Sequence, residues 1–442
     1  MKLSKKLLSI LMVLGLVIVL AACNNGDSAE EAEDTSATTE TTEEAAPAEE
    51  PKDVELTIVT PFDANLIGPE SIDAFQMAAD ELGYKIKLEN ITDESYKTRI
   101  MVNLTGNELP DLFFTWGDSD ALPYIEAGAV LPITDAINNS GLEFNKAYVT
   151  PHSDGNLYVA PYTPNDNYVV YYNKAIFAKI GKEPPKTWDE FIDVIKAVQA
   201  LNDGTFALGI GEKEKWQGDL LYNTLVLRED AMAFQKAMKG EMKFTDAPFV
   251  EASKKLKQLI DMNAFQKGYL QMAPTEMNEM FFNGQIAMQA IGTWLFNPSI
   301  ERLGDNLGYF PFPQSKPDGN YTDANTGMFG AIPNGMMVAK KTEFPEEAAK
   351  FAVTYSKIVN DLKVKKGQPP FIKTDAKPDK APHPAYQQYL DDVAKMTFVQ
   401  PWWFGVLDQA VGVPMRDLSQ LHMSGTITTE KFVEDLQKTL KP

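Results

Sequence analysis

The sequence predicts an α/β protein with mostly parallel sheets, helices on both faces of each sheet, and two lobes. From residue 54 onward, strand-like and helix-like segments alternate in the order β-α-β-α-β, which is typical of parallel sheets joined by helices. About 390 residues follow the N-terminal region, and a chain of that length usually divides its core between two lobes.

The first elements are predicted from their hydrophobic periodicity. Residues 54–60 (VELTIVT) and 111–116 (DLFFTW) are apolar runs of strand length, and residues 84–89 (YKIKLE) alternate between apolar and polar side chains. These patterns predict strands. Residues 71–82 and 96–106 have the apolar spacing of amphipathic helices.

The rest of the chain continues the alternation. Thr187 and Glu190 have the spacing of a capping box, in which each side chain accepts a hydrogen bond from the other residue's backbone N–H. We therefore expect a helix to begin there. The further predicted elements are one strand and three helices: 168–172 (YVVYY), 187–200, 345–356 and the segment from residue 429.

The N-terminal segment resembles a bacterial lipoprotein signal. Three lysines precede an apolar run over residues 7–20, and the small residues Ala21 and Ala22 lead to Cys23, the only cysteine. We expect residues 1–22 to be removed and the Cys23 thiol to be acylated, for example by palmitate. The alternative is a transmembrane anchor, because residues 7–23 approach the minimum spanning length of roughly 17 residues.

An acidic linker follows the cysteine. Residues 24–50 contain ten acidic residues and neither basic nor aromatic ones, so we expect residues 23–50 to be a disordered, extended spacer. The formal net charge is −21, and without the +3 of the signal and the −10 of the linker it is −14 for residues 51–442. That charge argues against nucleic acid or an anionic lipid surface as a partner.

Several kinds of chemistry are absent from the sequence. Once Cys23 is acylated no thiol remains, so the folded part has no disulfide, no cysteine-ligated metal and no cysteine nucleophile. The three histidines are isolated in sequence: His152, His383 and His422. We therefore predict neither a metal site nor a cofactor. Acidic neighbours such as Asp391 and Asp392 diverge by roughly 100° on a helix, which favours a solvated surface over the paired acids of a glycosidase.

Six segments follow one another along the chain: LPDLFFTWGD (109–118), EAGAVLPI (126–133), LYVAPY (157–162) with VYYNK (170–174), PPKTWDEF (184–191), FNGQIAM (282–288) and GTW (292–294). In this order they resemble the extracellular solute-binding proteins of ABC importers, in the sugar-binding and oligosaccharide-binding branch that includes maltose-binding protein. The resemblance extends from about residue 56 to the C-terminus.

The resemblance implies a two-lobed, periplasmic-binding-protein-like fold with a ligand cleft between the lobes. The chain would cross between lobes near residues 162–168 and 329–333, through short hinges that absorb the closing rotation. The implied division is 51–165 plus 331–395 for lobe one, and 166–330 plus 396–442 for lobe two.

The implied function is binding without catalysis. We expect a monomeric lipoprotein on the outer face of a Gram-positive cell membrane, which captures a carbohydrate and delivers it to an ABC permease. A binding protein for a peptide or polyamine, and a co-receptor that presents ligand to a sensor kinase, are the alternatives. The aromatic candidates and the few basic residues near the expected cleft argue for a neutral sugar over a carboxylate or phosphate ligand.

Four candidate ligand residues follow predicted strands. Trp116 and Asp118 come at the carboxyl end of the strand 111–116, where ligands bind in open parallel sheets. A carboxylate there accepts hydrogen bonds from sugar hydroxyls, although Asp118 is also suited to capping a turn. Phe62 and Asp63 follow the first strand in the same way.

The other candidates are mainly aromatic. Trp294 matches the position where the family stacks a ring on a sugar, with a core tryptophan as the alternative. Trp402 and Trp403 match a segment that bears a stacking aromatic and are ranked equally, ahead of Phe404. Tyr162 lies at the first crossing and can both stack and donate a hydrogen bond. Asx-rich loops and one tryptophan give weaker candidates: Asp323, Asp166, Asn165, Asn325 and Trp216.

Overall fold

The computed structural model describes residues 53–62, 69–91, 93–145, 149, 151–162, 166–315, 328–330, 334–396 and 399–440, with backbone alone for residues 69, 93, 94, 118, 328 and 329. Residues 53–442 form one compact unit. The expected signal segment, Cys23 and the acidic linker lie outside the described residues. None of the described helices combines the length and the apolar character needed to cross a bilayer.

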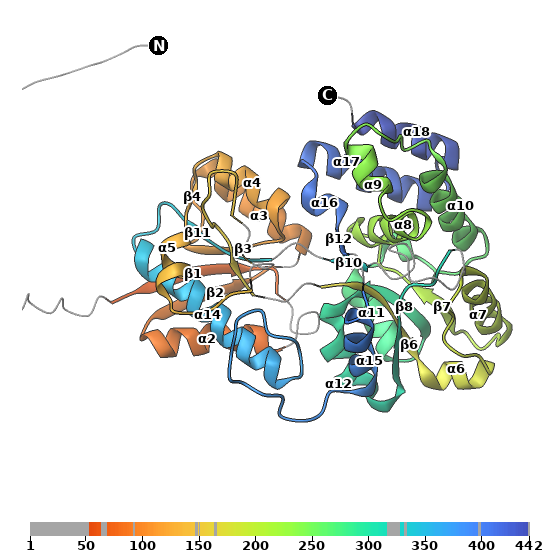
Figure 1. Ribbon diagram of the computed structural model, residues 1–442, viewed down its shortest axis with the longest axis horizontal. Coiled ribbons are helices and arrows are strands. Elements are labelled where there is room, and N and C mark those ends of the chain that lie inside the picture. Colours follow the sequence, from red (N-terminus) through yellow and green to blue (C-terminus); the bar gives the residue numbers. More distant parts are fainter. Residues whose placement is uncertain are drawn as a thin grey trace, which may run out of the picture. The chain divides into compact units, whose positions relative to one another are not determined.

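The first sheet is built from residues near the start of the unit and one strand from much later in the sequence (Figure 1). Its order is β2 (Lys85–Asn90), β1 (Glu55–Thr60), β3 (Leu112–Thr115), β11 (Gly335–Ala339) and β4 (Val130–Leu131), and β5 (Ala160–Pro161) also pairs with β11. Strands β2, β1 and β3 are parallel, whereas β11 runs antiparallel to β3, β4 and β5.

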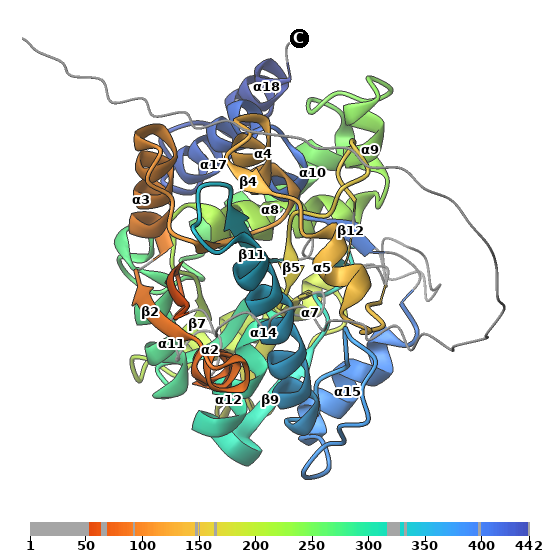
Figure 2. The same cartoon turned by 90° about the vertical axis from the view of Figure 1, so that its left-hand side faces the viewer.

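Helices cover both faces of this sheet. Figure 1 shows α2 and α14 below the strands and α3 and α4 above them, and Figure 2 shows α2 beside α14. The buried apolar residues around this sheet come from 54–162 and 336–372, and they define the first lobe. Its helices are α2 (Pro69–Leu82), α3 (Asp93–Gly106), α4 (Asp118–Glu126), α5 (Thr134–Asn139) and α14 (Pro345–Lys365).

The second sheet also has one reversed strand. Its order is β7 (Phe206–Gly209), β8 (Ile286–Gly292), β6 (Tyr168–Asn173) and β9 (Leu307–Phe310). Strand β6 is antiparallel to β8 and β9, whereas β7 and β8 are parallel. Each reversed strand follows a change of sheet. Strand β6 is the first strand of the second sheet after the chain leaves the first sheet, and β11 is the first strand that the chain adds to the first sheet after it leaves the second.

Two apolar clusters, on the two faces of this sheet, define the second lobe. Their buried residues come from 168–312 and 385–436. The helices of this lobe are α6 (Lys174–Ile180), α7 (Trp188–Ala200), α8 (Trp216–Glu229), α9 (Ala233–Met238), α10 (Ala247–Asp261), α11 (Pro274–Phe282), α12 (Phe296–Leu303), α15 (Pro384–Val393), α16 (Trp403–Val406), α17 (Gln409–Met423) and α18 (Thr429–Thr439), with 3-10 turns at Tyr269–Gln271, Thr293–Leu295 and Gly304–Asn306.

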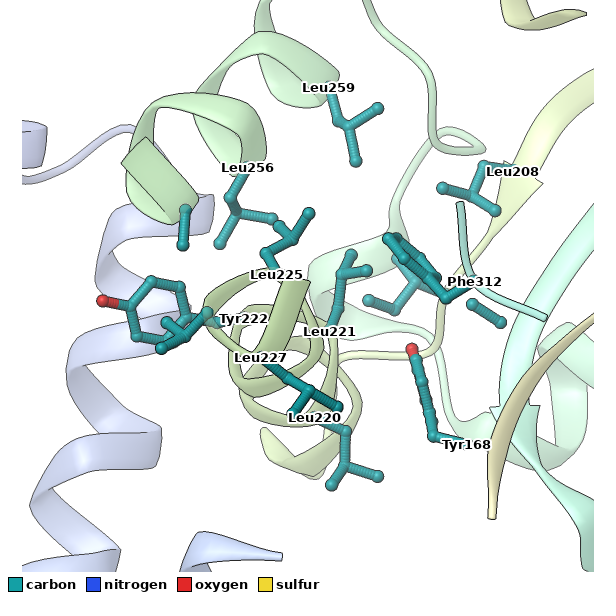
Figure 3. Close-up of a cluster of buried hydrophobic side chains, with 14 of the residues drawn as sticks. Tyr168, Leu208, Leu220, Leu221, Tyr222, Leu225, Leu227, Leu256, Leu259 and Phe312 are labelled. Carbon is teal, nitrogen blue, oxygen red and sulfur yellow. The ribbon is translucent and has the colours of Figure 1, made fainter. Parts of the chain in front are cut away.

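Helix α8 is the centre of the larger cluster. Its residues 217–228 are all buried, as expected for a helix that is covered on every side. Figure 3 shows Leu221 and Leu225 of α8 between α10, which contributes Leu256, and the sheet, which contributes Leu208. This packing fixes the start of α8, where Trp216 lies.

The predicted capping box forms as expected. The backbone N–H of Glu190 donates to Thr187 Oγ1 at 3.3 Å, and the backbone N–H of Thr187 donates to Glu190 Oε2 at 3.1 Å. The predicted strands at residues 54, 84, 111 and 168 correspond to β1, β2, β3 and β6, and the helix expected over 345–356 continues to Lys365.

Helix α15 packs on the second lobe, whereas the division expected from the sequence places residues 331–395 in the first lobe. Its Tyr386 ring lies 4.8 Å from that of Phe296, and its Tyr389 ring lies 5.7 Å from that of Tyr309. The chain therefore enters the second lobe before residue 384. The helix pattern alone indicates an apolar face but not the sheet that the face covers.

The crossing segments lie side by side. A two-stranded sheet pairs β10 (Met328–Gly330) in parallel with β12 (Val399–Pro401), and Gly330 also bridges to Asn167. The first crossing connects Tyr162 of the first lobe with Tyr168 of the second. Strand β12 leads directly into Trp402, so this hinge region positions the aromatic residues that follow it.

Candidate functional site

Two adjoining cavities, of about 100 and 640 Å³, lie between the lobes. We call the smaller the inner cavity and the larger the outer cavity. Residues from both lobes line each of them, and the two cavities share five wall residues: Lys97, Phe114, Trp116, Phe404 and Arg416. The cavities thus form one continuous interlobe cleft.

The first lobe supplies an aromatic wall to the inner cavity. Phe62 follows β1, and Phe114 and Trp116 lie at the end of β3, so parallel strand ends bring them together. Their rings are in contact: Phe114 lies 4.9 Å from Phe62 and 4.9 Å from Trp116. Tyr162, at the first crossing, lies 5.0 Å from Phe62. The Tyr96 hydroxyl bonds to both the N–H and the C=O of Phe114 at 2.6 Å, which fixes the end of β3.

The second lobe supplies the facing aromatic wall. Trp294 follows β8, and its ring lies 5.4 Å from Trp402 and 6.0 Å from Trp216. Phe404 lies 5.5 Å from Trp402. The Trp294 indole packs directly on Gly292, where an added Cβ would lie 1.8 Å from the ring carbon Cζ3. Only glycine permits this close approach.

Two cations lie over aromatic rings of the cleft. Lys97 Nζ is 4.5 Å from the Trp116 ring centroid, and Arg416 Cζ is 4.2 Å from the Phe404 ring centroid. Both distances are within the range of cation–π attraction. The positive groups therefore lie beside the rings that the two cavities share.

A buried acid lies at the first crossing. Asp166 lines the inner cavity, is 6% exposed, and accepts a hydrogen bond from Thr293 Oγ1 at 3.1 Å. Burial raises the pKa of Asp166 to about 6, partly offset by the positive charge of Lys363. Lys363 is itself buried, and burial lowers its pKa.

Two more acids lie inside the second lobe, near Arg416. Glu212 is fully buried, and its Oε2 accepts a hydrogen bond from the Gly218 N–H at 2.6 Å. Burial raises the pKa of Glu212 to about 8 and that of Asp219 to about 6, while the charge of Arg416 opposes both increases. Glu212 is therefore mainly protonated at neutral pH.

The lobes touch on both sides of the cleft. On one side Ser119 Oγ donates to the Phe404 carbonyl at 2.5 Å, and Gln409 Nε2 donates to Asp120 Oδ1 at 3.2 Å. On the other, Lys366 of the first lobe pairs with Glu301 of the second at 2.9 Å. These contacts join the two lobes beside the cavities.

The structure brings most of the predicted site residues together. Six of them line the cleft: Phe62, Trp116, Tyr162, Trp294, Trp402 and Phe404. So do two of the weaker candidates, Asp166 and Trp216. Whether they contact a ligand stays a prediction. The side chain of Asp118, together with Asp63, Asp323, Asn165 and Asn325, lies outside the described residues.

The equal ranking of Trp402 and Trp403 is wrong. Trp403 is 1% exposed and stacks on Phe234 at 4.6 Å with an interplanar angle of 9°. It also meets Tyr222 edge-on at 5.9 Å. Because adjacent residues point in different directions, Trp403 enters the core of the second lobe while Trp402 and Phe404 turn to the cleft.

Sequence reasoning missed Phe114, Lys97 and Arg416. Phe114 lies inside an apolar run that resembles a fully buried strand, and the two cations lie on helices where charged residues are common. The position of Phe114, two residues before Trp116, is a signal that was available, because alternate strand residues share a face. Within the described ranges, no group of His, Cys, Asp and Glu is arranged to hold a metal ion.

Comparisons with known proteins agree with this architecture. The model of the bacterial extracellular solute-binding protein family matches residues 68–356, more than half of the chain. A solved structure from a study of xylan utilization by the thermophilic bacterium Caldanaerobius polysaccharolyticus matches with a TM-score of 0.78 at 24% identity, over 88% of this chain and 100% of that one.

Two curated relatives match at low identity. An uncharacterized ABC transporter extracellular-binding protein of Pyrococcus horikoshii is 26% identical over 304 residues, which cover 65% of this chain and 68% of that protein. The multiple sugar-binding protein of Streptococcus mutans is 27% identical over 201 residues, which cover 44% of this chain and 46% of that protein. The match thus spans less than half the length of the second relative. On the family match and the shared fold, the chain belongs to the bacterial extracellular solute-binding proteins.

Proposed function

We propose that the protein binds a carbohydrate, an oligosaccharide in particular, in the interlobe cleft and delivers it to an ABC permease. The observation that carries this proposal is the pair of facing aromatic walls, with Trp116 in one lobe and Trp294 and Trp402 in the other. A pyranose ring has an apolar C–H face and a polar rim, so aromatic faces beside charged and amide groups suit both parts of it.

Binding and closure are coupled in this proposal. A ligand shifts a conformational equilibrium only by its differential affinity for the two states. A sugar held between Trp116 and Trp294 contacts both lobes at once, which favours an arrangement in which contacts such as Ser119–Phe404 and Lys366–Glu301 join the lobes. The closed lobes would then present one surface to the permease.

The names of the relatives support the ligand and the partner. One relative is named for multiple sugar binding and another as an ABC transporter extracellular-binding protein. The small residues before Cys23 and the apolar run before them support anchoring through an acylated Cys23. The acidic linker would keep a monomeric binding unit near its permease, on the outer face of a Gram-positive membrane.

The anchor has its own test. Cys23→Ala is expected to remove incorporation of a labelled fatty acid and to move the protein from the membrane fraction to the culture medium. Ser28→Ala, a few residues into the linker, is the matched control and stays in the membrane fraction. Membrane retention of the Cys23→Ala protein would refute acylation at this residue.

A glycan panel tests the ligand class. A ligand at 100 times its Kd stabilises the folded state by about 2.7 kcal/mol, so thermal unfolding in the presence of mono- and oligosaccharides should show a shift that grows with ligand concentration. Oligopeptides and polyamines are included in the same panel. A shift with one of these and with no carbohydrate would overturn the proposal.

A further inference from the structure

Two cations mark the junction of the inner and outer cavities. Lys97 comes from α3 of the first lobe and Arg416 from α17 of the second, and each lines both cavities. Their partner rings, Trp116 and Phe404, line both cavities as well. A ligand that extends from the inner to the outer cavity therefore passes both positive groups.

Neither cation has a close carboxylate partner. In the part of the chain that the structure describes, no ion pair involves Arg416, and its buried Nε has no hydrogen-bond acceptor. Lys97 Nζ lies 4.0 Å from Asp120 Oδ2, and this distance is the outer limit for an ion pair. Asp120 also accepts the Gln409 hydrogen bond from the other lobe, so its charge is shared.

The acids near Arg416 offset its charge only in part. Glu212 and Asp219 lie inside the second lobe rather than in the cleft wall. Because burial raises the pKa of Glu212 to about 8, that side chain carries little charge at neutral pH. Asp219 is the remaining compensating group, and it accepts a hydrogen bond from Asn223 at 3.2 Å.

Other charges of the cleft are matched within the protein. In the outer cavity Lys215 pairs with Asp417 at 2.7 Å, and the Glu214 carboxylate accepts a hydrogen bond from Trp216 Nε1 at 3.1 Å. In the inner cavity the positive charge of Lys363 acts on the Asp166 carboxyl and partly offsets the effect of burial on the Asp166 pKa. The charged residues that line both cavities, Lys97 and Arg416, are thus both cationic, in a protein whose formal net charge is −21.

We propose that the ligand is an acidic carbohydrate, whose carboxylate or phosphate oxygens bind between Arg416 and Lys97 while its rings contact the aromatic walls. The inference rests on the carbohydrate-binding function proposed above and replaces the neutral sugar expected from the sequence. A guanidinium binds an oxyanion through two parallel hydrogen bonds. A neutral sugar would instead partly desolvate Arg416 while the buried Asp219 remained its main counter-charge, which is costly.

Matched pairs of sugars test the inference by titration calorimetry. Oligogalacturonates are compared with their methyl esters, glucuronate-substituted xylo-oligosaccharides with unsubstituted ones, and hexose phosphates with hexoses. We expect one acidic member to bind at least about tenfold more tightly than its uncharged counterpart, the equivalent of one charge-assisted hydrogen bond. The preference should decrease from low to high salt. Comparison of the uronate pairs with the hexose phosphate pairs shows whether the site prefers a carboxylate or a phosphate.

Variants connect the preference to the two cations. Arg416→Gln should abolish the preference for the acidic sugar, because it should lower the affinity for the acidic member by at least about tenfold more than the affinity for its uncharged counterpart. Arg416→Lys should retain part of the preference for the acidic sugar. If Arg416→Gln fails to fold, the same comparison of acidic and uncharged sugars is made with Lys97→Gln. Arg302→Gln is the control, because Arg302 stacks on Phe282 at 5.0 Å outside both cavities.

The outcomes separate this inference from the proposed function. If carbohydrates bind but no acidic member exceeds its uncharged counterpart, the acidic ligand is refuted and the carbohydrate function stands. An acidic preference that survives both Arg416→Gln and Lys97→Gln would also refute the assignment. If no carbohydrate of either kind binds, both the inference and the proposed function fail.

Discussion

The buried carboxyl of Glu212 should make the stability of the protein fall as the pH rises. Its side chain is fully buried, and burial raises its pKa from 4.5 to about 8. The folded state therefore holds a proton that the unfolded state releases above about pH 4.5. Where the folded state binds more protons, the free energy of unfolding decreases with increasing pH.

The size of this effect follows from the two pKa values. Between pH 5 and pH 7, linkage with a pKa of 4.5 unfolded and about 8 folded lowers the free energy of unfolding by about 2.5 kcal/mol. Glu212→Gln keeps the shape and an acceptor for the Gly218 N–H but does not titrate. Relative to the wild type, the variant should gain about 2.5 kcal/mol between pH 5 and pH 7.

Urea unfolding at several pH values measures this difference. Asp219 titrates in both proteins, so its contribution cancels to first order in the comparison. Glu279→Gln is the control: its hydrogen bond from Arg302 lowers the pKa of Glu279, so its titration lies below this window. A constant difference between wild type and Glu212→Gln across the pH range would refute a protonated Glu212 in the folded protein.

Three further predictions concern the tryptophans of the second lobe. Trp294→Ala should weaken sugar binding by ~1–3 kcal/mol, with base–aromatic stacking as an analogue; equal affinity by calorimetry would remove Trp294 from the site. Gly292→Ala should displace the Trp294 indole, since the new Cβ would lie 1.8 Å from a ring carbon, and should weaken binding in the same assay; unchanged binding would show that the indole position is unimportant. Trp403→Ala should destabilise the fold by about 3–5 kcal/mol in urea, as for a large buried aromatic; a loss of affinity without a loss of stability would contradict its place in the core.

The sequence predicts local structure well where one pattern dominates. The apolar runs VELTIVT and DLFFTW form β1 and β3, and the Thr187–Glu190 spacing forms a complete capping box. The direction of a strand relative to its neighbours could not be predicted in the same way, because an apolar run such as YVVYY fits a parallel or an antiparallel strand equally well. The reversal of β6 depends on how the chain crosses between the lobes.

The site was predictable in composition but not in detail. Strand ends predicted Trp116 and Phe62 as neighbours, since parallel strands bring their carboxyl ends to one edge, and both residues line the inner cavity. The choice between Trp402 and Trp403 depends on the path of the chain after β12, which sequence spacing does not specify. Lys97 and Arg416 line the same two cavities only because α3 of one lobe and α17 of the other both border the cleft.

Tryptophan fluorescence tests the central claim, that a carbohydrate binds between the aromatic walls, most directly. Four of the six tryptophans line the cleft: Trp116, Trp216, Trp294 and Trp402. Titration with a sugar that stabilises the protein should change the emission to saturation and protect it from a soluble quencher. The change should persist in Trp188→Phe, whose indole lies away from both cavities, and shrink in Trp294→Phe. Saturable sugar binding by calorimetry with no change in emission or quenching would contradict the account.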